Sequence, residues 1–177
     1  MPTEQVGAAA AQNVIEDFSP SAPFELPGDG LWTAVCKHRN PTDWTIDWTL
    51  SINLMAGMFS ARAVWTREAV EAGGWLYSYE LAHQGLGEIT ADGMLHGPFH
   101  ESTTVTWAKD GVTGGPQVTE YDGNMYGAFS ADLKSICISR GEDPGNYDID
   151  YIRHIGREAF FGPDMGCEAE CTISRSP

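Results

Sequence analysis

The sequence predicts an all-β domain, either an up-and-down antiparallel barrel or a sandwich, followed by one helix. Three observations support this prediction. Residues 44–54 alternate between apolar and polar side chains, shorter segments with the same period recur along the chain, and glycine-rich turn signals separate them. Near the C-terminus the apolar spacing becomes helical. With 177 residues, the chain is long enough for one domain with a buried core.

The clearest strand runs from Trp44 to Leu54. Its apolar residues lie two apart, and they are Trp44, Ile46, Trp48, Leu50, Ile52 and Leu54. The residues between them are all polar, which is typical of a strand with one buried face and one face in water. A helix would need apolar residues three and four apart.

Weaker alternation predicts further strands from Leu31 onward, at 75–81, at 99–107, at 118–129 and at 133–140. Glu101 is an exception among the alternating residues of the third of these segments. Turn signals separate the segments, and they are Gly73-Gly74, Asp92-Gly93, Asp110-Gly111, Gly114-Gly115 and Asp122-Gly123. Short strands at regular spacing are typical of a barrel or a sandwich.

One helix is predicted after the last of these strands, at about residues 147–161. A turn at 143–146 comes before it, and the helix ends before Gly162-Pro163. Its apolar residues have helical spacing, and they are Ile149, Ile152, Ile155 and Ala159. Residues 1–29 are polar, rich in alanine and interrupted by proline, so we expect an arm wrapped on the domain or a loose tail. Residues 30–177 form the single predicted domain.

The composition excludes several classes of function. The formal net charge of −15 argues against nucleic acid and against anionic membrane surfaces, because both attract basic proteins. No apolar run approaches the roughly 18 residues of a membrane span. Residues 1–11 show no signal-peptide pattern, so we expect a cytosolic protein or one whose leader has been removed.

Four cysteines allow three pairings if all of them are bridged, and they are Cys36, Cys137, Cys167 and Cys171. Disulfides are favoured over free thiols and over zinc, because no second close pair accompanies Cys167 and Cys171. Disulfide bonds would favour a secreted protein or an organelle lumen.

Three short segments occur in an order that resembles the lipocalin family of the calycin superfamily. They are Gly30-Leu31-Trp32, Thr119-Glu120-Tyr121 and Ile138-Ser139-Arg140. Lipocalins open their first strand with G-x-W, carry T-D-Y before a late strand, and have an arginine where the last barrel strand ends. Here Glu120 replaces the aspartate, and Tyr126 lies further along than the family pattern would place the next tyrosine. The resemblance implies an eight-stranded barrel around a cavity, one C-terminal helix packed outside, and residues 167–173 as a short edge strand beside the first.

The resemblance also implies which end of the barrel is closed and which end is open. Trp32 would close the barrel floor with Arg140 packed across its indole, a structural pair, and the first loop would lie at the mouth. Counting by twos from Trp32 places Cys36 and His38 on the inner face, with His38 near the mouth. The chain has many large rings for a barrel that holds either packed side chains or one small ligand. The candidate ligand contacts are Cys36, His38, Trp44, Trp48, Tyr77, Tyr79, Trp107 and Tyr126.

The resulting hypothesis is a carrier or sequestering protein for a small hydrophobic molecule, with no cofactor. The alternative is a cofactor-independent isomerase, lyase or cyclase in the same cavity, with His38 and either Tyr77 or Tyr79 as acid and base. Titratable groups at mid-depth would favour the enzyme, and polar groups only at the rim would favour the carrier. A third interpretation is a packed sandwich that binds another protein.

The remaining histidines suggest no metal site. His96 and His100 are expected to flank a surface turn, because Gly97-Pro98 between them forbids a helix. His83 and His154 are expected to be exposed.

Overall fold

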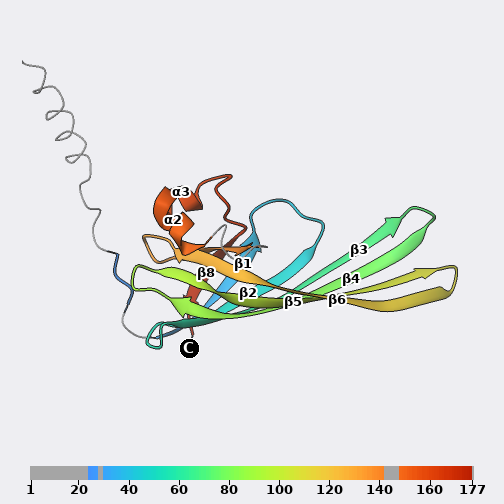
Figure 1. Cartoon of the computed structure of the whole chain (residues 1–177), viewed down its shortest axis with the longest axis horizontal. Helices are drawn as coiled ribbons and strands as arrows, with labels where there is room; N and C mark the ends of the chain where they lie inside the picture. The colour runs from blue at the N-terminus through green and yellow to red at the C-terminus, as the bar shows by residue number, and fades with distance from the viewer. Residues whose placement is uncertain (1–23, 28–29, 142–147, 177) are drawn as a thin grey trace, which may run out of the picture.

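The computed structural model describes residues 24–27, 30–141 and 148–176. Within them, eight antiparallel strands form a closed barrel (Figure 1). Each strand pairs with the next in the sequence, and the last pairs with the first. The strands are β1 (Leu31–His38), β2 (Thr45–Asn53), β3 (Met58–Glu71), β4 (Trp75–Ile89), β5 (Met94–Lys109), β6 (Val112–Phe129), β7 (Ser135–Gly141) and β8 (Ala169–Arg175). The eight-stranded antiparallel barrel is therefore confirmed, and the sandwich is wrong because the ring closes.

Alternation along the strands fills the barrel with side chains. In β2 every second residue from Trp48 to Ile52 is buried, and β3 continues the pattern from Phe59 to Trp65. The buried core includes Trp48, Leu50, Ile52, Phe59, Leu95, Phe99, Met125, Ile136 and Ile138. These residues pack together across the lumen, so the middle and floor of the barrel are a packed core.

Two long hairpins carry the sheet beyond the barrel (Figure 1). Pairing between β2 and β3 stops at Thr45 and Thr66, and pairing between β6 and β7 stops at Asn124 and Gly141. Strands β3 to β6 stay paired up to their turns, and residues 67–79 and 105–117 form a four-stranded extension. At its tips the predicted turns at Gly73-Gly74 and Asp110-Gly111 are confirmed, all with positive φ.

Two predicted turns are wrong, because Gly114-Gly115 and Asp122-Gly123 lie inside β6. A Cβ atom at Gly114 would overlap the Trp107 indole, and one at Gly123 would overlap the Phe99 ring. These glycines let an aromatic ring from β5 lie against the backbone of β6. Ring packing between the strands therefore accounts for the two glycines.

Two short helices replace the single predicted helix. They are α2 (Ile149–Ile155) and α3 (Arg157–Phe161), and Gly156 separates them with a φ of 93°. Asp148 caps α2 by accepting a hydrogen bond from the Ile149 amide at 2.6 Å. The apolar stripe packs outside the barrel against strands β5 to β7. The predicted turn at 143–146 lies outside the described residues.

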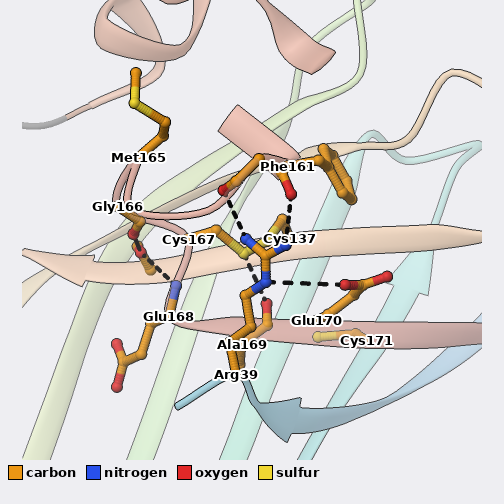
Figure 2. The surroundings of a disulfide bond; sticks show 12 residues. Arg39, Cys137, Phe161, Met165, Gly166, Cys167, Glu168, Ala169, Glu170 and Cys171 are labelled. Carbon is orange, nitrogen blue, oxygen red and sulfur yellow. Dashed lines mark hydrogen bonds and ion pairs between the residues drawn. A yellow bond between two sulfur atoms is a disulfide. The ribbon is translucent and has the colours of Figure 1, made fainter. Parts of the chain in front are cut away.

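Strand β8 lies beside β1, as expected of the segment around 167–173. It also pairs with β7, so it closes the barrel as its eighth strand and is not an added edge strand. Cys36 and Cys171 form a disulfide between β1 and β8 on the inner face. Cys137 and Cys167 form a second disulfide on the outer face (Figure 2).

Most of the predicted N-terminal arm lies outside the described residues. In the short stretch at 24–27, Phe24 packs against the core, and the Arg157 guanidinium lies 3.9 Å from the centre of its ring. None of the helices in the described ranges is long and apolar enough to cross a membrane.

Candidate functional site

The barrel opens where β1 ends and β2 begins. Pairing between these strands stops at Cys36 and Trp48, so the residues between them diverge. A cleft of about 420 Å³ lies in this opening. We call it the mouth cleft, and it is lined by Cys36, Lys37, His38, Arg39, Asn40, Pro41, Thr42, Trp44 and Ile46. Three of the predicted ligand contacts, Cys36, His38 and Trp44, therefore meet around one space.

A row of aromatic rings leads away from the mouth cleft along the extension. The Trp44 ring lies 6.0 Å from that of Tyr79, which lies 6.2 Å from that of Tyr77. The Trp107 ring is a further 6.2 Å from Tyr77. The prediction grouped these four residues as ligand contacts, and the structure brings them together beyond the closed part of the barrel.

The other two predicted ligand contacts lie elsewhere. Trp48 is only 1% exposed and packs between Trp65 and His83. Tyr126 projects to the outer side of the wall, because its neighbour Met125 takes the inner position, and its ring lies 6.0 Å from that of Phe160. Tyr126 therefore packs under α3 and does not face the lumen, which corrects the prediction.

Arg140 does not pack on Trp32 as predicted. Strand register places Trp32 opposite Arg175, and the Arg175 guanidinium lies 5.7 Å from the indole centre. Arg140 lies at the mouth end of β7, where its guanidinium stacks 3.8 Å above Trp65. The floor tryptophan thus has a cationic neighbour, but that neighbour comes from β8.

Ionisable side chains form a chain across the barrel from its middle to its mouth. His83 Nδ1 donates to Glu101 Oε1 at 3.0 Å, and Arg140 Nη1 donates to the same oxygen. Arg140 Nε donates to Glu168 Oε1 at 3.1 Å, and His38 Nε2 lies 3.6 Å from that oxygen. We call these five residues the charged chain.

Sequence reasoning missed most of the charged chain. His83 was expected to be exposed, yet it is only 1% exposed. One signal in the sequence indicated that His83 is buried. It lies two residues after Leu81 in the series Tyr77, Tyr79 and Leu81, so it belongs to the same inward face of the strand. The second signal was Glu101, the exception in an otherwise alternating strand that pairs directly with His83.

The charged chain keeps its central pair ionised. Burial raises the pKa of Glu101, but the hydrogen bond from His83 and the charge of Arg140 outweigh it, so the pKa lies below its usual value. Burial lowers the pKa of Arg140, but Glu168 and Glu101 reverse that effect and raise it. Nearby, the buried indole N–H groups of Trp48 and Trp65 have no hydrogen-bond acceptor among the described residues.

This pKa shift predicts how stability depends on pH. A carboxyl group whose pKa is lower in the folded state stabilises the fold above its unfolded pKa, here about 4.5, and this contribution disappears as the pH falls through the folded value. We expect the Glu101 contribution to be constant from pH 7 to pH 5, approximately, and to fall at lower pH. Urea unfolding of wild type and Glu101→Gln at several pH values measures it. A stability difference that did not shrink in acid would contradict the assignment.

The proposed acid–base partners of His38 do not meet it. His38 Nδ1 lies 3.0 Å from the Asn40 carbonyl oxygen, and Tyr79 donates its hydroxyl to Glu71 at 3.0 Å. Within the described residues, no hydrogen bond or ring contact joins His38 to Tyr77 or Tyr79. The enzyme hypothesis therefore has no support from this pair.

His96 and His100 lie within β5 and do not flank a turn as expected. His100 Nδ1 is 2.8 Å from Asp122 Oδ1, and His96 Nε2 is 3.8 Å from Glu88 Oε2. Across the described part of the chain, no group of three or more histidine, cysteine or acidic side chains is arranged to hold a metal ion.

Comparison with known protein families finds no family that matches the chain, and comparisons with curated proteins and with solved structures find no significant similarity. The likeness to lipocalins therefore rests on the three sequence segments. In the structure they lie at the floor end of β1, within β6 and at the mouth end of β7.

Proposed function

We propose that this protein binds a small hydrophobic molecule in the mouth cleft, as a carrier or sequestering protein. The observation that carries the proposal is the meeting of Cys36, His38 and Trp44 around a space of about 420 Å³. Ligand sites for small molecules are typically about 300–1,000 Å³ and combine apolar walls with a few polar groups. The mouth cleft has both features.

The ligand would be held mainly by apolar contact. Trp44 and Ile46 form the apolar wall, and the ring row continues it towards Tyr79. Burying apolar surface stabilises a complex by about 25 cal/mol per Å². His38 would orient the polar end of the ligand. Because packed side chains fill the middle of the barrel, the ligand would sit at the mouth and not deep in the lumen.

The rim of the mouth cleft is held in place from outside. Arg39 donates hydrogen bonds to the carbonyl oxygens of Phe161 and Gly162, and its Nε lies 3.9 Å from Glu170 (Figure 2). These contacts tie the end of β1 to α3 and β8. A rim already fixed before binding loses less conformational freedom on binding, which favours affinity.

Catalysis in the same barrel is the second candidate. One observation favours it, namely that His83 and Glu101 place titratable groups at mid-depth. Carriage ranks first because neither residue lines the mouth cleft. In addition, a carboxylate with a lowered pKa is a weak general base near neutral pH. Incubation of a bound molecule with the protein, followed by product analysis, distinguishes the two candidates.

The disulfides suggest where the protein works. Two bridges join all four cysteines. Disulfides persist in oxidising compartments and are rare in the cytosol. We propose a secreted or organelle-lumen setting, which a thiol count on the protein purified from its natural source would test.

Trp44→Ala is expected to weaken ligand binding at least tenfold, because it removes the largest apolar wall of the mouth cleft. Tenfold corresponds to about 1.4 kcal/mol. The measurement is a fluorescence titration with retinoid, carotenoid, fatty-acid and bilin probes. Trp75→Ala is the matched control, since Trp75 is also half-buried but lies at the tip of the extension beside Lys109. Equal loss in both variants, or none in Trp44→Ala, would contradict the proposal.

A further inference from the structure

We propose that a second cleft at the barrel mouth binds the ammonium head group of an organic amine. This inference goes beyond the proposed function and does not depend on it. The cleft measures about 200 Å³ and is lined by Phe99, Glu101, Tyr121, Arg140 and Gly141. It lies where β7 ends at Gly141 and β6 continues with β5 as its one remaining paired strand, and we call it the Glu101 cleft.

The Glu101 carboxylate lines this cleft, and only one of its two oxygens accepts hydrogen bonds from the described residues. The residue is 7% exposed, and its Oε1 atom accepts hydrogen bonds from both His83 and Arg140. Its Oε2 atom has no hydrogen-bond or ion-pair partner within the part of the chain that the structure describes. This oxygen is not among the fully buried polar atoms that lack a partner, so it is accessible and can accept a hydrogen bond from a further donor. A ligand N–H group in the cleft would supply it.

Aromatic rings form the other walls. Phe99 is packed in the core and Tyr121 is 37% exposed, and their ring centres lie 5.8 Å apart at an angle of 51°. The faces of aromatic rings attract cations, most strongly where water is excluded. A cleft lined by a carboxylate and two aromatic rings is therefore suited to an ammonium group.

The charge of the site also favours a cation. Arg140 lines the cleft, but Glu101 and Glu168 both bind its guanidinium, so two carboxylates surround one positive charge. An anionic ligand would meet Glu101 directly, and the whole chain carries a formal charge of −15. A neutral alcohol could donate to Oε2 but would gain nothing from the net negative charge. The small volume suits a head group, with the rest of the amine outside.

The test compares n-butylammonium with 1-butanol, which has nearly the same shape and no charge. Binding is followed by NMR shifts of the Tyr121 and Gly141 backbone amides. We expect n-butylammonium to bind wild type at least tenfold more tightly than 1-butanol. Glu101→Gln should abolish this preference. Glu120→Gln removes the same charge from an exposed residue beside Tyr121, and it should retain the preference.

A second variant keeps the test valid if Glu101→Gln fails to fold. Tyr121→Leu removes a partly exposed ring and keeps the carboxylate, so we expect a folded protein with weaker ammonium binding. Equal affinity for the amine and the alcohol, or equal loss in Glu120→Gln, would overturn the proposal. Trp44 lines the mouth cleft and not the Glu101 cleft, so the effect of Trp44→Ala on probe binding separates failure of the proposed function from failure of this one.

Discussion

Replacing Arg140 with methionine is expected to destabilise the barrel by about 3–5 kcal/mol. The guanidinium stacks 3.8 Å above Trp65 and binds the carboxylates of Glu101 and Glu168. Methionine fills part of the same space but leaves both carboxylates without their cation. A charge left uncompensated inside a protein is among the largest single destabilising changes. Urea unfolding followed by tryptophan fluorescence measures the loss.

Arg153→Met is the matched control for this experiment. Arg153 also pairs with two carboxylates, Asp92 and Asp150, but its side chain is 40% exposed. Exposed ion pairs contribute about 0–1 kcal/mol. We further expect Glu101→Gln and Glu168→Gln, added to Arg140→Met, to restore part of the lost stability. If Arg140→Met destabilised the protein no more than Arg153→Met, the charged chain would not be a main source of the stability of the barrel.

Removing the Cys36–Cys171 disulfide by alanine substitution of both cysteines is expected to reduce the free energy of unfolding by about 5 kcal/mol. This bridge joins residues 135 positions apart and holds the first strand to the last. Cys137 and Cys167 are 30 positions apart. Loop-closure entropy gives about 4 kcal/mol for that separation, so the same change there should have the smaller effect.

Urea unfolding of the two double variants tests this order. Alanine is chosen because all four cysteines are buried, and it adds no polar group to the core. A larger loss on removing Cys137 and Cys167 would show that barrel closure does not depend mainly on the β1–β8 bridge.

The strands with large inward residues were the predictable part of the fold. In β2, three buried residues, Trp48, Leu50 and Ile52, alternate with polar ones, and the prediction of a strand is confirmed. Strand β3 was not predicted, although it has the same burial pattern. Its inward residues include Ala61 and Ala63, and its outward ones include an apolar valine. Contrast between the two faces is therefore weak, and pairing with β2 and β4 decides the conformation.

The sequence could predict which candidate site residues of one strand share a face, but not which residues of different strands meet. Counting by twos placed His38 and Cys36 together, and the structure places both at the mouth cleft. The partners of Glu101 lie on β4 and β7, so they follow from strand register and from packing across the lumen. Arg140 illustrates the same limit, because no local pattern indicates that it stacks on Trp65. Turn signals failed inside β6 for a related reason, since the glycines there accommodate rings of a neighbouring strand.

The most direct test of the central claim uses the six tryptophan indole N–H groups as separate NMR probes. The ¹⁵N-labelled protein is titrated with the retinoid, carotenoid, fatty-acid and bilin probes. If a ligand occupies the mouth cleft, the Trp44 indole should shift most, followed by its neighbour Trp65. The signals of Trp32 at the floor and Trp75 at the extension tip should stay unchanged. No shift at Trp44 with any probe, or shifts of equal size at all six indoles, would contradict the account.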